Sequence, residues 1–232
     1  MRSTFLADDF SLAQDTRTRS VTDQIFDLLY DRVVNLTLRP GARLSETEVA
    51  TQMGVSRQPV RDAFYRLSQL GFIQIRPQRA TIVTPISEEA VLQAYFIRAA
   101  LEESCLRVAA QRLTDEHLDA LDQVLDAQAH AIESDDRAGF HALDDRFHHD
   151  LCTFAGLDFV WTLVRETKGH MDRARYLSLS YGADTAFAEH RLILDALRRR
   201  DADAAVAAIR QHLSRIEGII ARLRIDQPEV FG

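Results

Sequence analysis

The chain has 232 residues, long enough for one or two domains with a substantial core. Its formal net charge of −7 excludes a general nucleic-acid coat, but residues 19–86 carry nine Arg against six Asp or Glu, a balance of +3, and residues 87–232 carry −9. A mildly basic segment followed by an acidic one is typical of a protein that contacts DNA at one end only.

The first predicted element is a helix over residues 21–36. Residues 1–18, which precede it, are polar and aperiodic, so we expect a flexible arm there. The sequence LRPG at residues 38–41 then ends the helix and turns the chain. The helix is predicted from apolar residues at helical spacing, namely Val21, Ile25, Leu28, Leu29 and Val33.

Residues 45–67 predict two short helices joined by a turn. Ser45 and Glu48 form a capping-box pair at the start of the first helix, and Gly54 can take the left-handed conformation that ends it. Ser56 is a suitable N-cap for the second helix, and Pro59 falls in its first turn. The pattern therefore predicts a helix-turn-helix.

The second of these helices presents polar residues from the face opposite its apolar stripe. Arg57, Gln58, Arg61 and Arg66 lie on that face, while Val60, Ala63, Phe64 and Leu67 point inward. A helix-turn-helix with Arg and Gln at the start of its second helix is suited to the DNA major groove. The alternative is an ordinary helical hairpin with a solvated basic face.

A β-hairpin is predicted next. Two β-rich runs, residues 71–75 and 80–84, bracket a polar tip at residues 76–79 that contains two arginines. Helix, helix-turn-helix and hairpin follow one another in the order of a winged helix-turn-helix domain. We expect this domain to span residues 19–86.

The motifs LRPGxxLSE, GVSRxPVRxA, LxxLGFI and IRPxR resemble the N-terminal domain of the GntR family of bacterial transcription regulators. The resemblance implies that Arg57, Arg61 and Arg79 contact operator DNA, with Arg39 as a further contact. Ser56 and Gln58 belong to the same predicted DNA-binding segment. Ala80 departs from the family, which usually has glycine there; if that position needs a positive φ, alanine is disfavoured.

From Ser87 onward the sequence predicts only helices, and short loops between amphipathic helices imply an antiparallel bundle. The fold class is therefore mainly α, a winged helix-turn-helix followed by an all-α domain over residues 87–232. No long apolar run or signal peptide occurs, so we expect a cytoplasmic protein with no membrane contact, and Cys105 and Cys152 as reduced core residues. The predicted helices are 87–112, 115–134, 137–155, 158–180, 184–199 and 202–225.

Four residues of this bundle are candidate metal ligands. Asp144 and His148 are four residues apart and share one helix face, so both can reach one ion. His190 and His212 lie among apolar positions of the last two helices. Taken singly, each histidine is better explained as a hydrogen-bonded core residue than as a ligand. Four other histidines are interpreted as solvated or rim positions without a role: His117, His130, His141 and His149.

The segments YFIRAALE, ALDDRFHHDLCTFAG, AEHRLILDALRRRD and AAIRQHL resemble the FCD ligand-binding domain of the FadR subfamily. The resemblance implies a divalent ion, zinc or nickel by its donor set, held by Asp144, His148, His190 and His212. It also implies that Arg98 binds a carboxylate effector, although an ion pair with Glu102 is the alternative. Arg173 or Arg175 is a further candidate contact.

These resemblances predict a regulator, most simply a repressor, that binds a pseudo-palindromic operator as a homodimer. A small carboxylic acid bound at the metal would change the affinity for DNA. One alternative is a sensor in which the metal itself is the signal. Another is a metal-dependent hydrolase, against which stand the lack of an HExxH motif and of an obvious general base. Glu189 is adjacent to His190 and so is expected to point to a different face.

Overall fold

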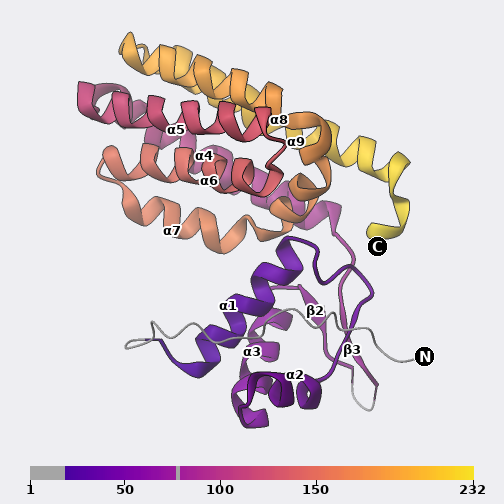
Figure 1. The fold of residues 1–232 in the computed structure, drawn as a ribbon. Helices are drawn as coiled ribbons and strands as arrows, with labels where there is room; N and C mark the ends of the chain where they lie inside the picture. Colours follow the sequence, from indigo (N-terminus) through magenta and orange to yellow (C-terminus); the bar gives the residue numbers. More distant parts are fainter. Residues whose placement is uncertain (1–18, 77–78) are drawn as a thin grey trace. The chain divides into compact units, whose positions relative to one another are not determined.

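A computed structural model describes residues 19–76 and 79–232, which form two compact units (Figure 1). One unit runs to Ile86 and includes Glu229–Gly232; the other is Ser87–Pro228. The predicted N-terminal arm, residues 1–18, and part of the predicted wing tip, residues 77–78, lie outside the described residues. No helix within the described ranges is long and apolar enough to cross a membrane.

The helices of the first unit follow the sequence pattern. Helix α1 spans Val21–Val34, α2 spans Glu46–Met53, and α3 spans Arg57–Gln69. The Ser45 hydroxyl accepts a hydrogen bond from the backbone N–H of Glu48, and Gly54 ends α2 with a φ of 64°. The core of this unit consists of apolar side chains from all three helices, including Ile25, Leu29, Val33, Val49, Val60, Phe64 and Leu67.

Ser56 occupies the N-cap position of α3, but its hydroxyl makes no capping hydrogen bond, contrary to expectation. Ser56 is exposed, so water can satisfy the first backbone N–H groups of the helix. This leaves both the hydroxyl and the helix N-terminus available to an anion such as a DNA phosphate.

The predicted hairpin is part of a larger sheet. Among the described residues the sheet has three antiparallel strands in the order β1-β3-β2: Arg43–Leu44, Thr81–Val83 and Ile73–Gln74. Strand β1 was not predicted, because two residues are too few to show an alternating pattern. Within the described ranges positive φ among non-glycine residues is confined to Leu36, Asp135 and Arg200, so Ala80 has an ordinary φ and the expected strain does not arise.

The last residues of the chain pack against the end of the first unit. The backbone N–H of Ile86 donates to the carbonyl of Val230 at 2.7 Å, and Ile86 forms a parallel β-bridge with Phe231. The sequence-based boundary assigns these residues to the helical domain. In the structure the last long helix ends at its C-cap, Gln227, before they begin.

The described part of the second unit contains six α-helices: α4 Glu88–Arg112, α5 Asp115–Glu133, α6 Arg137–Phe154, α7 Asp158–Thr167, α8 Gly169–Arg198 and α9 Ala202–Asp226. Side chains of Ser87, Thr114, Asp136 and Asp201 cap four of them. Helices α4, α8 and α9 pack against one another, and α5 packs against α6 and α8. Their common core consists mainly of leucine, isoleucine, valine and alanine.

One predicted helix break was wrong. The sequence predicted helices 158–180 and 184–199, whereas the chain breaks at Lys168 and then continues unbroken through Gly182 as α8. A glycine inside a helix costs about 1 kcal/mol relative to alanine, which packing along a 30-residue helix can outweigh. The real break lies where buried Lys168 binds Asp145 and Asp172.

Candidate metal centre and DNA interface

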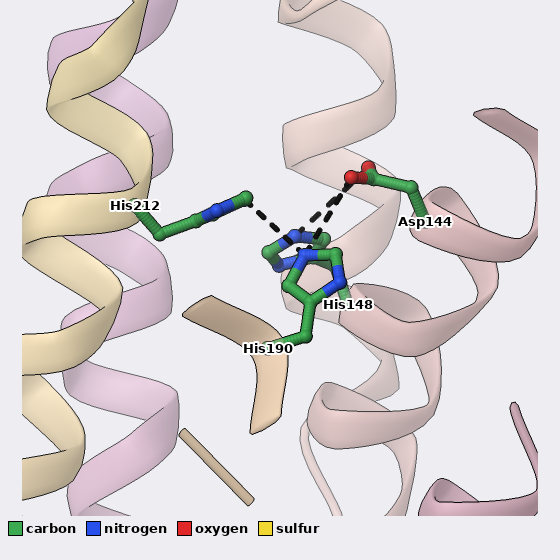
Figure 2. A group of neighbouring side chains, drawn as sticks. All are labelled: Asp144, His148, His190 and His212. Carbon is green, nitrogen blue, oxygen red and sulfur yellow. Dashed lines mark hydrogen bonds and ion pairs between the residues drawn. The ribbon is translucent and has the colours of Figure 1, made fainter. Parts of the chain in front are cut away.

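The four predicted metal ligands come together inside the bundle (Figure 2). Asp144 and His148 project from α6, His190 from α8 and His212 from α9, and one candidate ligand atom of each lies within 4.8 Å of the others. All four side chains are buried. Asp144 and His212, the outermost of the four in sequence, are 68 positions apart. Figure 2 shows all four side chains facing one point.

Each imidazole is oriented by a partner that accepts a hydrogen bond from its Nδ1. His148 Nδ1 lies 2.6 Å from a carboxylate oxygen of Glu102, and His212 Nδ1 lies 3.1 Å from one of Glu189. His190 Nδ1 lies 2.9 Å from the amide oxygen of Gln128. Since these oxygens only accept, each Nδ1 carries the proton and each Nε2 presents a lone pair to the centre.

The centre is therefore lined by acceptors. The Nε2 atoms of His190 and His212 are 3.3 Å apart, and His190 Nε2 is 3.5 Å from Asp144 Oδ1. Asp144 Oδ1 and His148 Nε2 are buried without a hydrogen-bond partner. Buried acceptors facing one another with no donor are unfavourable unless a cation lies between them. The donor set, three imidazoles and a carboxylate, suits zinc or nickel.

The ionisation states also suit a metal. Burial lowers the pKa of His212, and burial together with the neighbouring His212 lowers the pKa of His190 well below its ordinary value. Burial alone would raise the pKa of Asp144, but the Arg175 guanidinium, 2.5 Å from Asp144 Oδ2, together with the neighbouring His148, His190 and His212, outweighs it and holds that pKa well below its usual range. His190 and His212 are thus neutral imidazoles and Asp144 is an ionised carboxylate, the forms that bind metal.

A cavity of about 420 Å³ adjoins this centre. Arg98, Arg175 and His212 line it, so a ligand in the cavity can contact a predicted metal ligand and two predicted effector-binding arginines. Arg98 binds Glu102 at 2.5 Å, as the alternative interpretation proposed, yet its Nη2 is a buried donor without a hydrogen-bond partner. Arg98 therefore retains a donor for a carboxylate.

Of the two candidate arginines of α8, Arg175 lines the cavity, whereas Arg173 does not belong to its described lining. Arg173 is fully buried, and burial lowers its pKa to about 10. Arg173 and Arg175 are two residues apart on the same helix, so their side chains point in directions about 200° apart.

Two further expectations were wrong. His141 is buried rather than solvated; its ring packs against Tyr176, and its Nε2 lies 3.9 Å from Asp172 Oδ1. Glu189 does not point away from the site, because it reaches His212 on the neighbouring helix. Sequence reasoning also missed Gln128, although a glutamine three residues after Leu125 on an apolar helix stripe was a signal of a buried polar role.

The predicted DNA-binding residues are all exposed on the first unit: Arg39, Ser56, Arg57, Gln58, Arg61 and Arg79. On α3, Arg57 and Arg61 lie 3.4 and 3.5 Å from the Glu46 carboxylate of α2. Gln58 donates to Asp62 at 2.8 Å. These are solvated partners that a phosphate or base edge can replace at small cost.

Arg66 differs from the other polar residues of α3. It binds Asp23 of α1 at 2.7 Å and lies over the Phe26 ring, 4.0 Å from its centroid. These contacts tie α3 to α1, so Arg66 supports the packing of the unit rather than its exposed face.

A winged helix-turn-helix unit joined to a separate helical bundle defines a DNA-binding regulator. The model of bacterial regulatory proteins of the gntR family matches residues 21–83, and that of the FCD domain matches residues 93–215. The chain belongs to the GntR family, with an FCD ligand-binding domain of the FadR-like kind. It is a DNA-binding transcriptional regulator and not an enzyme.

Curated relatives agree with this assignment, and a solved structure agrees with the fold. The HTH-type transcriptional repressor RspR of Escherichia coli K12 is 38% identical over 217 residues, covering 93% of this chain and 95% of the relative. A probable D-xylose utilization operon transcriptional repressor of Paenarthrobacter nicotinovorans is 31% identical over 202 residues, covering 86% and 88%. E. coli McbR/YncC shares the fold at a TM-score of 0.75 and 21% identity, covering 88% of this chain and 99% of that one.

Proposed function

We propose that this regulator is a repressor whose affinity for operator DNA is controlled by a small carboxylic acid bound beside a metal ion in the helical domain. The observation that carries the proposal is the set of four converging acceptors without a donor, next to a cavity that contains a buried, partly unpaired guanidinium. Repression is inferred from the two relatives that are named repressors.

The ion would be held by Asp144, His148, His190 and His212, and zinc or nickel fits these donors. When bound, it would supply positive charge and open coordination positions for a carboxylate oxygen. The protein's own contribution is orientation. Glu102, Gln128 and Glu189 fix the imidazoles, and Arg175 holds the second oxygen of Asp144.

The acid would enter the cavity and bind the free Nη2 donor of Arg98. Arg175, which already binds Asp144, would contribute a second positive charge. Because the cavity lies among α4, α6, α8 and α9, a ligand there contacts several helices at once. Binding free energy that differs between two arrangements of these helices would shift the operator affinity, usually downward.

We also propose that the chain acts as a homodimer. Helices α4 and α7 pack against each other and expose large apolar side chains, of which Phe96 is 74% and Phe159 63% exposed. Apolar surface of this kind is typical of an interface. Sedimentation of the purified chain should give a dimer, and Phe96→Glu should give a monomer; a wild-type monomer at micromolar concentration would contradict the proposal.

The function is tested in two steps. Elemental analysis of the purified chain should find about one zinc or nickel ion per chain, as one set of four ligands implies. Operator DNA selected in vitro should then bind the metal-loaded protein, and a screen of small carboxylic acids should find one that weakens this binding. If neither Asp144→Ala nor His190→Ala alters the response to any acid, the centre has no regulatory role.

The alternative, a sensor of the metal itself, predicts a different result. Operator binding would then change between metal-stripped and metal-loaded protein with no acid present. The buried ligands favour an ion retained through purification. Retained metal together with an acid-dependent melting temperature would support the metabolite sensor.

A further inference from the structure

Positive charge extends along the cavity beyond the candidate metal centre. Among the described residues that line the cavity, four are arginines and none is Asp or Glu: Arg98, Arg175, Arg215 and Arg222. Arg98 and Arg175 already account for one carboxylate beside the metal. Arg215 and Arg222 have no role in that interaction: Arg215 binds Glu189 at 3.0 Å and Arg222 binds Asp226 at 3.2 Å, both outside the described lining. The cavity thus presents more guanidinium groups than a single carboxylate would use.

These arginines are distributed from the inside of the cavity to its mouth. The side chains of Arg98 and Arg175 are 1% and 14% exposed, whereas those of Arg215 and Arg222 are 39% and 57% exposed. On α9, Arg215 follows His212 by three residues and Arg222 follows it by ten, which places them about 4.5 and 15 Å farther along the helix axis. The cavity thus has an inner and an outer cationic end.

The walls between the two ends are mostly apolar. Described side chains of α6, α8 and α9 contribute them: Phe140, Met171, Leu213, Ile216 and Ile219. An apolar wall stabilises a hydrocarbon segment and leaves a hydroxylated one without hydrogen-bond partners. The lining therefore suits a ligand with two charged ends and an aliphatic middle.

Arg215 connects the outer end to the metal centre. Its Nη1 binds Glu189 Oε1 at 3.0 Å, while the other oxygen of the same carboxylate accepts from His212 Nδ1 at 3.1 Å. A guanidinium has five N–H donors, so Arg215 can bind a ligand carboxylate while it keeps Glu189. The Glu189 carboxylate thus contacts both the candidate metal ligand that it orients, His212, and the arginine that would bind the outer anion.

We propose that the effector is an aliphatic dicarboxylate, with its inner carboxylate at Arg98 beside the metal and its outer carboxylate at Arg215, near the Arg222 at the mouth. This inference rests on the proposed function of the same cavity. It narrows the class of ligand from small acids in general to dianions, and it assigns Arg215 as the residue that distinguishes dianions from monoanions.

The test compares acids that differ only in the outer charge. Zinc-loaded full-length protein is titrated calorimetrically with malonate, succinate, glutarate and adipate, and with the half-amide of each, which keeps the shape and removes one charge. We expect the best-fitting dianion to bind about tenfold or more tightly than its half-amide, since a hydrogen-bonded charge pair is gained. In Arg215→Gln this ratio should fall to about one, with half-amide affinity retained.

Two control variants test whether the preference for dianions depends on the positive charge of Arg215. Arg215→Lys retains a cation that can still pair with Glu189, so it should keep the zinc content and part of the preference for dianions. Arg210→Gln removes an arginine of the same helix that binds Glu103 and does not line the cavity, so the preference should be unchanged.

Each outcome decides between the two proposals. Equal binding of dianions and half-amides by the wild type, or a preference that survives in Arg215→Gln, overturns the dicarboxylate inference and leaves a carboxylate effector standing. Failure of every acid in both series to bind the zinc-loaded wild type overturns this inference and the proposed carboxylate site together.

Discussion

The arginines of helix α3 and those of the helical bundle lie in opposite environments. Arg57 and Arg61 are 59% and 57% exposed and lie 3.4–3.5 Å from Glu46, a distance that gives weak, solvent-screened pairs. Arg98 is 1% exposed and binds Glu102 at 2.5 Å. The first pair of arginines can exchange partners at little cost, as contact with DNA requires. The buried arginine has a fixed position, as discrimination among small ligands requires.

The carboxylates that bind these arginines also differ between the first unit and the helical bundle. In the first unit, one oxygen of Glu46 forms long ion pairs with two arginines, Arg57 and Arg61, and fixes the position of neither. In the bundle, Glu102 binds Arg98 with one oxygen and His148 with the other, and although burial raises its pKa, Arg98 and His148 lower it to about 2. The bundle thus contains connected, ionised networks, and changes there should have larger and more local consequences than changes on α3.

The largest effect is expected from Asp144→Ala. This change removes one ligand and leaves the Arg175 guanidinium without its carboxylate. Loss of an outer partner of a ligand costs 10–100-fold in metal affinity, so loss of a ligand should weaken zinc binding by more than about 100-fold. Competition with a chromogenic chelator measures this. Asp145→Asn, at the next residue, should retain zinc; equal affinity of the Asp144→Ala and wild-type proteins would remove Asp144 from the centre.

Arg61→Ala should have the next largest effect, and it should change the affinity for DNA without changing zinc binding. Loss of a base- or phosphate-contacting arginine costs about 1–3 kcal/mol, or roughly 5- to 150-fold in affinity. Fluorescence anisotropy with selected operator DNA at several salt concentrations measures both the affinity and its salt dependence. Arg66→Ala on the same helix should change DNA affinity by no more than about twofold, as for a surface change away from the contact. Equal losses in both variants would place the contact elsewhere.

Gln128→Ala should weaken zinc binding about tenfold while leaving the fold intact, because His190 loses the partner that fixes its orientation. The same chelator competition provides the measurement, and circular dichroism checks the helix content. Gln123, exposed on the same helix, offers the matched control Gln123→Ala. Unchanged zinc affinity in Gln128→Ala would show that burial alone orients the imidazole.

The smallest effect concerns acid stability. Burial would raise the pKa of Asp172, but Lys168 and the other neighbouring cations outweigh it and lower that pKa below 3.8. A lowered pKa in the folded state gives stability that is present above the unfolded value and lost as pH falls through the folded one. Urea unfolding should therefore show a loss below about pH 4, and Asp172→Asn should reduce that loss. An equally steep acid transition in the variant would assign it to other carboxylates.

Local patterns were enough to predict much of the molecule. The helix-turn-helix follows from caps, a turn glycine and an apolar stripe, each of which acts within a few residues. Asp144 and His148 were candidate ligands by their spacing, and His190 and His212 by their apolar surroundings, but the resemblance to the FCD domain assigned all four to one ion. Strand β1 was missed because a two-residue strand has no period. The helix break at Lys168, whose side chain binds Asp145 and Asp172, was missed as well.

The outer partners of the ligands could not have been found from spacing. Glu189 lies 23 residues before His212, and Gln128 lies 62 residues before His190. Neither pair has a local periodicity that would place the two side chains together, because their contact depends on how α5, α8 and α9 pack. For the same reason Arg175 could not be distinguished from Arg173 until the rotation of α8 against the cavity was known.

The central claim is that the bundle controls the DNA-binding unit. Its most direct test is the affinity of the protein for selected operator DNA in buffer that contains zinc. Anisotropy measures this affinity with and without saturating acid, in the wild type and in Asp144→Ala. We predict that acid weakens operator binding by the wild type by about 5- to 150-fold, the usual range of allosteric coupling, and leaves the variant unaffected. The same affinity with and without every acid that binds the wild type would contradict the account.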